Sequence, residues 1–90
     1  MNRADLNQSA VVKALRSVGA SVEITNQQGK GFPDLCVAIF GINYLMEVKN
    51  PDDKYWKLTP DQVIFHDKWK GKIYIVETPD DALRAIGVEV

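Results

Sequence analysis

The sequence predicts a mixed α/β domain in which helices pack on one layer of sheet, in the order helix, strand, strand, strand, helix, strand, helix, αβββαβα. Three observations lead to this prediction: an apolar hairpin pattern in the middle of the chain, Thr-Pro helix starts at two places, and an apolar repeat of helical spacing near the N-terminus. The chain has 90 residues, so we expect residues 1–90 to form a single domain with one core.

The N-terminal segment predicts a helix followed by a strand. Asp5 and Gln8 fit a capping box, and apolar residues then recur near helical spacing until Gly19, a common helix stop. We therefore expect a helix over residues 6–18. The following letters, "ASVEITN", alternate apolar and polar residues as in a half-buried strand, and "NQQGKGFP" has the glycines and proline of a loop.

Two further helices begin with the same cap pattern. In "LTPDQVIFHDKWKG", Thr59 is the expected N-cap and Pro60 the first helical residue, with the end of the helix near Trp69 or Lys70. The letters "KIYIVE" predict a strand after this helix. "TPDDALRAIG" then repeats the start signal with Thr78 as N-cap and predicts a short third helix.

The central segment "GFPDLCVAIFGINYLMEVKN" predicts two apolar strands around a turn. A two-residue turn with Gly41 at its first central position would be of type II′ and would set Asp34 opposite Lys49. Since side chains alternate along a strand, Asp34, Glu47 and Lys49 then share one face, whereas a three-residue turn would separate them. The other face collects the apolar residues Leu35, Val37, Ile39, Tyr44, Met46 and Val48.

The charged face of this hairpin has the chemistry of a metal site. Two neighbouring carboxylates raise each other's pKa unless a cation lies between them. Oxygen ligands suit Mg²⁺ or Mn²⁺, whereas zinc prefers His or Cys, of which the chain has one each. We expect Asp34, Glu47 and the Val48 backbone carbonyl to bind the metal and Lys49 to act on a nucleophilic water. Such a site suits the attack of water on a phosphodiester.

Composition excludes several classes of protein. A single cysteine rules out a disulfide framework, and no apolar run approaches the roughly 20 residues of a membrane span. The N-terminal letters lack the apolar core of a signal peptide, so we expect a cytoplasmic protein without membrane contact. The net charge is -1, and the lysines between residues 52 and 72 are nearly cancelled by aspartates.

The same residues match a known pattern. "PD" at residues 33–34 and "EVK" at residues 47–49 look like the PD-(D/E)XK nuclease signature. More narrowly, "KGFPDL", "YLMEVKNP", "KLTPDQ" and "VETPDDALRAIG" resemble the VRR-NUC domain family, particularly its small stand-alone phage and bacterial members. The resemblance covers nearly the whole chain and implies a restriction endonuclease-like core.

The resemblance also implies a function. It implies a DNA endonuclease dependent on Mg²⁺ or Mn²⁺ that acts on branched DNA such as four-way junctions. The small members are similar to Holliday junction resolvases, which implies a homodimer in which each subunit cuts one strand. The corresponding location is the cytoplasm of a bacterial cell or of a phage-infected host.

Carried over by position, the resemblance makes Asp34 and Glu47 metal ligands, Lys49 the residue that acts on water, and Gln62 a polar helix residue beside the site. Family members commonly carry a glutamate in the first helix, where this chain has "NQSA". Gln8 could reach a metal there only through water. Three lysines are candidate DNA contacts: Lys30, Lys54 and Lys57.

Two other functions fit these residues. The missing helix glutamate favours a catalytically weak DNA-binding or accessory module that retains the nuclease fold. A sequence-specific restriction-like nuclease is the second alternative, which would cut long duplex DNA into discrete fragments.

Helix capping alone explains Gln8 and Gln62, since each is the third residue after an expected cap. His66, the lone histidine, is expected to have a structural role.

Overall fold

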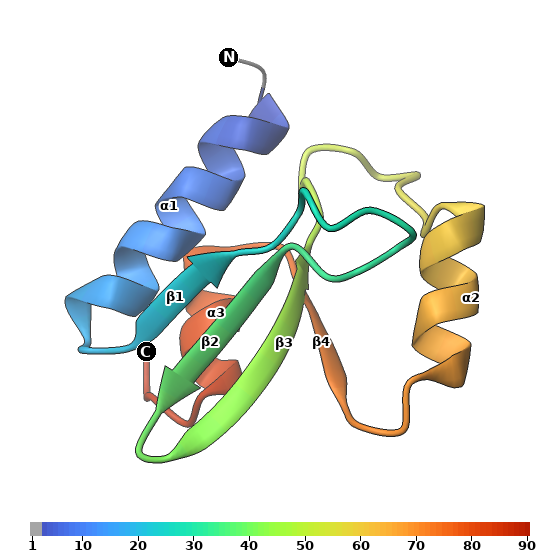
Figure 1. The fold of residues 1–90 in the computed structure, drawn as a ribbon. Coiled ribbons are helices and arrows are strands. Elements are labelled where there is room, and N and C mark those ends of the chain that lie inside the picture. Colours follow the sequence, from blue (N-terminus) through green and yellow to red (C-terminus); the bar gives the residue numbers. More distant parts are fainter. Residues whose placement is uncertain (1–2) are drawn as a thin grey trace.

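The structure, a computed structural model, describes residues 3–90, with side chains described from residue 6 onward. The four strands form one sheet in the order β1-β2-β3-β4, antiparallel except that β4 runs parallel to β3. The predicted element order αβββαβα is confirmed. The elements, labelled in Figure 1, are α1 (Arg3–Ser17), β1 (Ser21–Ile24), β2 (Leu35–Ile39), β3 (Ile42–Val48), α2 (Pro60–Lys68), β4 (Ile73–Val76) and α3 (Pro79–Ala85).

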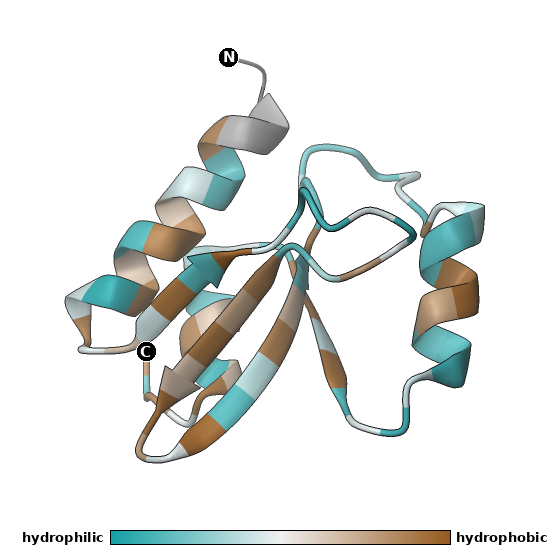
Figure 2. Ribbon diagram, in the orientation of Figure 1, coloured by the Kyte–Doolittle hydropathy of each residue, from teal (hydrophilic) through white to brown (hydrophobic). Residues whose placement is uncertain are grey.

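The core lies between one face of the sheet and the helices α1 and α3. Leu35 and Met46, which pair across β2 and β3, are fully buried there, as are Val11 and Leu15 of α1 and Ala82 of α3. Apolar colours gather on the strands in Figure 2, whereas the loops at the end of the sheet opposite the β2–β3 turn are hydrophilic. The predicted apolar face is confirmed, with Leu35, Val37, Ile39, Tyr44, Met46 and Val48 all buried or half-buried.

The turn between β2 and β3 differs from the prediction. Ile39 pairs with Ile42, so the two central residues are Phe40 and Gly41, with positive φ of 54° and 77°. Positive φ at both central positions defines a type I′ turn, so the predicted type II′ turn is wrong. Glycine suits the second central position of type I′ as well as the first of type II′, and its presence alone does not select between them.

This turn shifts the hairpin register, so that each residue of β2 lies opposite a residue of β3 two positions earlier than predicted. Leu35 pairs with Met46, so the next residues along, Asp34 and Glu47, lie level with each other, and the predicted pairing of Asp34 with Lys49 is wrong. Both turns have two central residues, which preserves the alternation of side chains. Asp34, Glu47 and Lys49 therefore still share the face opposite to the core.

The helix boundaries follow the cap signals at two of three helices. In α2 and α3 the Thr59 and Thr78 side chains accept hydrogen bonds from the backbone N–H three residues on, and both capping boxes are complete. The prediction that Asp5 caps the first helix is wrong, because α1 begins at Arg3. Residues with good helix propensity precede the apolar repeat and extend the helix by part of a turn.

α2 is attached to the sheet mainly through its first turn. None of its residues is buried, and it stands at the opposite side of the molecule from α1 (Figure 1). Gly31, with φ of 81°, packs so closely on this turn that a Cβ there would lie 2.3 Å from the Asp61 carbonyl oxygen. The Phe32 ring also meets the Phe65 ring edge to face, with centroids 5.3 Å apart. The loop before β2 therefore sets the position of α2.

Within residues 3–90, no helix is both long and apolar enough to cross a membrane.

Candidate active site

Asp34 lies where the loop enters β2 and is held by its backbone and by its side chain. Its carbonyl oxygen accepts a hydrogen bond from Thr25 N at 2.8 Å, and the Thr25 hydroxyl donates to Pro33 O, also at 2.8 Å. Its carboxylate oxygen Oδ2 accepts from Val48 N at 2.8 Å. The carboxylate is thereby fixed against the last residue of β3, on the face opposite to the core.

Glu47 is a buried carboxyl group, with 1% of its surface exposed. Its Oε2 accepts from Gln62 Nε2 at 3.1 Å, while its Oε1 is buried without a hydrogen-bond partner. Burial raises the pKa of Glu47 from 4.5 to about 9, and the neighbouring carboxyl group of Asp34 with its negative charge adds to this rise, against the opposing charge of Lys49. The pair of carboxyl groups therefore requires either a proton or a cation between them.

The Val48 carbonyl points toward the same place. Within one trans peptide unit the C=O and the N–H point in opposite directions. Lys49 N donates to Val76 O of β4 at 2.9 Å, so the Val48 carbonyl in the same peptide unit points to the β2 side, where Asp34 lies. Two carboxylates and this carbonyl then form a set of oxygen donors at the ends of β2 and β3.

These donors fit a hard divalent cation. The described part of the chain contains no group of three or more His, Cys, Asp and Glu side chains that could hold a metal. Mg²⁺ is commonly bound through one or two carboxylates and keeps several waters, and it does not require a cage made only of protein ligands. The orphaned Oε1 of Glu47 is the polar atom that such a cation would satisfy.

Gln62 connects the buried carboxyl group to Lys49. Its Oε1 accepts from Lys49 Nζ at 2.9 Å, and its Nε2 donates to Glu47. The same Oε1 accepts from Thr59 N at 3.0 Å in the capping box. Gln62 is therefore both a capping residue of α2 and a neighbour of the site, because the cap holds its amide in the orientation that bridges Glu47 and Lys49.

Three further residues that were not predicted from the sequence surround Lys49 and its backbone: Trp56, Asn7 and Glu77. The Trp56 ring lies 6.0 Å from Lys49 Nζ, and Trp56 Nε1 donates to Glu77 Oε2 at 3.0 Å. Asn7 Nδ2 of α1 donates to Lys49 O at 3.1 Å and to Glu77 O at 2.9 Å. Except for the contact between Trp56 and Lys49, these contacts join residues 21 or more positions apart along the chain, so local sequence patterns do not reveal them.

His66 also lies close to this network. It follows Gln62 by one helical turn on α2, and burial together with the nearby Lys49 charge lowers its pKa from 6.5. Its Nε2 is buried without a hydrogen-bond partner. The imidazole is therefore held in its neutral form, next to the ammonium group of Lys49.

The other residues proposed from the sequence lie in a groove or in exposed loops. Gln8 lines a groove with Val12 and Ile24, between α1 and β1. Lys54 and Lys57 are exposed and lie on either side of Trp56 in the loop that follows β3, and Lys30 is exposed in the loop that precedes β2. Roles for these four residues in water-mediated metal binding and in DNA binding stay predictions.

Comparison with known proteins supports the fold. No protein-family model and no curated protein matches the sequence. A solved structure described as a VRR_NUC domain is similar to this chain, with a TM-score of 0.75 over 96% of each chain and 22% sequence identity. The predicted fold is thereby confirmed. The four-stranded mixed sheet with three helices is the fold of a VRR_NUC domain, of the PD-(D/E)XK type.

Proposed function

We propose that residues 1–90 form a single nuclease domain that hydrolyses phosphodiester bonds of DNA with Mg²⁺ or Mn²⁺. The observation that carries the proposal is the contact between the carboxyl groups of Asp34 and Glu47, in which a buried oxygen of Glu47 has no partner. A cation binding there would replace the proton that keeps Glu47 neutral. The likeness to a VRR_NUC domain supports a nuclease-like function for the same fold.

Each residue has a distinct role in this proposal. The Asp34 and Glu47 side chains and the Val48 carbonyl would hold the cation. When bound, such a cation neutralises charge that develops on the phosphoryl oxygens and makes water a stronger acid. Lys49 lies at the edge of this site, where its ammonium can donate a hydrogen bond to the attacking water or to the scissile phosphate.

Gln62 would position Lys49 for this step. Its amide lies between Glu47 and Lys49 and bonds to both of them. The amide oxygen of Gln62 accepts one of the three N–H donors of the Lys49 ammonium, which leaves two for water and phosphate. The Trp56 ring on another side of Lys49 limits where the ammonium can move.

We further propose that the substrate is branched DNA and that two copies of the chain act together. The support for a homodimer is apolar surface on the side of the sheet away from α1 and α3. There, Val63 and Ile64 of α2 are each 52% exposed, and Ile75, which pairs with Glu47, is 42% exposed. Apolar residues left in water by one copy are typical of a surface that a partner covers.

Cleavage of labelled oligonucleotides tests the nuclease. A four-way junction, a flap and a plain duplex are incubated with the protein in Mg²⁺, Mn²⁺ or EDTA. We expect cutting that requires the cation, that favours a branched substrate and that Lys49→Ala abolishes. Arg84→Ala, which removes a cation from α3, serves as the control and should cut like the parent. Cutting that persists in EDTA or in Lys49→Ala would exclude the proposed site.

A second candidate is a DNA-binding or accessory module with little catalytic activity. It is favoured by one observation, the acidic pair without a third carboxylate in the described residues. This candidate predicts that the protein binds the branched oligonucleotide in every condition without cutting it. The same gel, run beside a binding assay, therefore separates the two candidates.

A further inference from the structure

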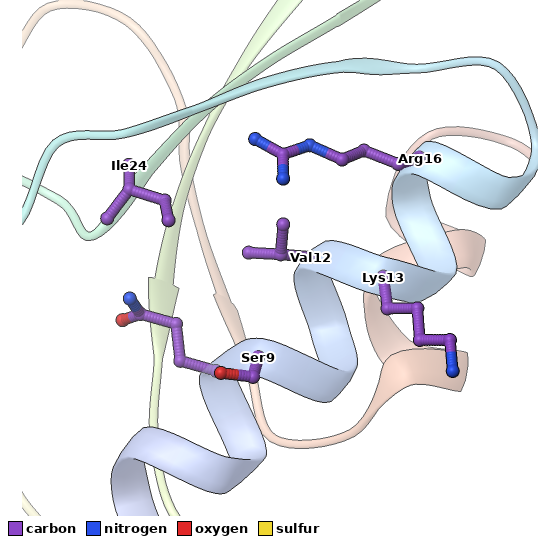
Figure 3. A pocket seen from close by; sticks show the side chains of 6 residues that line it. Ser9, Val12, Lys13, Arg16 and Ile24 are labelled. Atoms are coloured by element: carbon purple, nitrogen blue, oxygen red, sulfur yellow. The ribbon is translucent and has the colours of Figure 1, made fainter.

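A groove runs between α1 and the edge of the sheet at β1. Its volume is roughly 360 Å³, a size common for sites that hold a small ligand or part of a larger one. β1 has a neighbouring strand only on its β2 side, so the groove lies at the outer edge of the sheet. Its lining residues, drawn in Figure 3, are Gln8, Ser9, Val12, Lys13, Arg16 and Ile24.

One end of this groove is formed by residues whose chain neighbours contact the backbone of the proposed active site. On the strand wall, Ile24 pairs with Leu35, and the next residue, Thr25, bonds through its N–H to Asp34 O at 2.8 Å. On the helix wall, Gln8 follows Asn7, whose amide donates to Lys49 O at 3.1 Å. Both walls of the groove are therefore continuous along the chain with residues that contact the backbone of Asp34 and Lys49.

The groove carries positive charge in a protein whose net charge is -1. None of its six lining residues is acidic, and two are cationic. Arg16 reaches across Val12 toward the strand, whereas Lys13 extends outward at the rim (Figure 3). Arg16 Nη2 donates to Val22 O at 2.9 Å, which holds the guanidinium at the groove and leaves most of its five N–H donors for a phosphate.

Apolar surface lines the groove between these polar groups. Ile24 has the same orientation as the buried Val22, yet it is 51% exposed because α1 does not cover it. Its exposed side chain offers contact to the faces of bases or sugars, whereas Val12 belongs to the buried core and is only 5% exposed. Gln8 and Arg16 are eight residues apart, about 12 Å along the helix axis, which gives the groove the length of a short single-stranded segment.

Resting on the proposed nuclease function, we propose that this groove binds a single-stranded arm of the DNA substrate, with Arg16 and Lys13 on its phosphates and Ile24 against its bases or sugars. Single strands bind where a positively charged track runs beside surfaces that contact unpaired bases. A base-paired arm keeps its base faces stacked inside the duplex and cannot use the apolar wall. The groove would therefore select substrates that have an unpaired arm at the cleavage site.

Equilibrium binding in EDTA tests this proposal without any cleavage. Fluorescent oligonucleotides with a single-stranded flap and with a blunt end are titrated with the parent and with Lys13→Gln/Arg16→Gln over a range of salt concentrations. For single strands, each phosphate contact contributes about 0.7 to the slope of log K against log salt. We expect the double variant to lower the slope by about 1.4 on the flap substrate, with an affinity loss of about tenfold, and to bind the blunt duplex like the parent.

Two control variants keep the test specific. Arg84→Gln removes a positive charge from α3 and should leave both slopes unchanged. Arg16→Lys keeps the positive charge and should show most of the parent's salt slope, even though the hydrogen bond to Val22 O is altered. Thermal melting identifies any variant that fails to fold, and Lys13→Gln alone, at the exposed rim, still predicts a slope change of about 0.7.

The outcomes also separate this proposal from the nuclease itself. If the parent cuts flaps in Mg²⁺ or Mn²⁺ but the double variant keeps the full salt slope, the nuclease stands and the groove proposal is wrong. An equal loss on flap and blunt duplex would overturn it as well, because the groove would then hold duplex DNA. If the parent cuts no substrate yet the slope falls as expected, the groove binds single strands and the catalytic proposal fails.

Discussion

Glu47 shows at the scale of one residue how a buried acid makes stability depend on pH. Its pKa is raised from 4.5 to about 9, so between these values the folded state holds a proton that the unfolded state has lost. The associated stability is fully present below 4.5 and is lost as the pH rises toward 9. His66 acts in the opposite direction, because its lowered pKa removes stability as the pH falls below 6.5.

The first prediction follows from this difference. Above pH 6.5, His66 is neutral in the folded and the unfolded state. Of these two residues, Glu47 alone then makes the free energy of unfolding depend on pH. We expect urea unfolding in EDTA to show the parent losing on the order of 2 kcal/mol between about pH 7 and about pH 9. Glu47→Gln, which cannot ionise, should show a flatter profile. Equal slopes in the two proteins would mean that Glu47 is not neutral in the folded state.

The residues of the acidic pair could be predicted from the sequence, because the alternation of side chains along a strand decides which of them share a face. Asp34, Glu47 and Lys49 remained on one face although the predicted register was wrong by two residues, since a shift by two residues preserves the alternation. Asn7 and Glu77 were not accessible, because their contacts depend on how α1 and β4 pack beside β3. Local pattern predicts faces, and it does not predict contacts between distant segments.

At the scale of an element, α2 links a local cap to the proposed chemistry. Its capping box resembles that of α3, where Asp81 Oδ2 accepts from Thr78 N at 3.2 Å, but only the amide of Gln62 also reaches Glu47 and Lys49. Such a pair of equivalent caps provides an internal control.

The second prediction compares these two caps. Gln62→Ala and Asp81→Ala should each lower the free energy of unfolding by about 1 kcal/mol, because each removes one half of a capping box. Only Gln62→Ala should also slow metal-dependent DNA cleavage, by about tenfold, because a side chain that orients a ligand and Lys49 is lost. Equal cleavage rates in the two variants would reduce Gln62 to a cap.

The third prediction concerns the loop that holds α2. Gly31→Ala adds a Cβ 2.3 Å from the Asp61 carbonyl oxygen and 2.8 Å from Gln62 N, so the first turn of α2 must shift. Gly29→Ala is the matched control, since Gly29 has a similar φ of 78° but open space around its Cβ position. We expect Gly29→Ala to cost about 1 kcal/mol of stability through backbone strain alone.

For Gly31→Ala we expect a loss of about 3 kcal/mol, together with slower cleavage as Gln62 moves. Denaturant unfolding and the cleavage rate measure the two effects. If both alanine variants behaved alike, strain alone would explain the glycine, and the close packing of the loop on α2 would have no part in the site.

The hairpin turn shows where prediction of elements stops. The Thr-Pro pattern correctly predicted where two helices begin, because the cap, the proline and the third residue interact within the first helical turn. The turn depended on Phe40, which adopts positive φ although such residues rarely do so. The pairing of Ile39 with Ile42 requires that conformation of Phe40, and the sequence around Gly41 alone does not predict it.

At the scale of the whole molecule, the sheet has unequal faces. α1 and α3 bury one face, whereas the other carries the acidic pair at one end and exposed apolar residues beside α2. A domain of 90 residues has a small hydrophobic core, whose stabilising free energy offsets little of the cost of exposing these apolar residues to water. This arrangement underlies the proposal of a homodimer.

The fourth prediction tests that arrangement. Sedimentation equilibrium should give twice the chain mass of 10.1 kDa for the parent, and Ile64→Glu/Ile75→Glu should give the monomer, because charges in a buried apolar contact are costly. Leu6→Glu is the control, since Leu6 is 57% exposed on α1, which packs on the opposite face. A parent that sediments as a monomer, or a dimer insensitive to the double variant, would exclude this surface.

Metal binding at Asp34 and Glu47 is the claim on which the proposed chemistry rests, and calorimetry of Mn²⁺ binding tests it directly. Titrations near neutral pH in two buffers of different ionisation enthalpy give both the affinity and the number of protons released. We predict one Mn²⁺ per chain with release of about one proton, because the raised pKa of Glu47 keeps it protonated until the cation binds, and loss of binding in Asp34→Asn. Unchanged binding in Asp34→Asn, or binding without proton release, would contradict the proposed site.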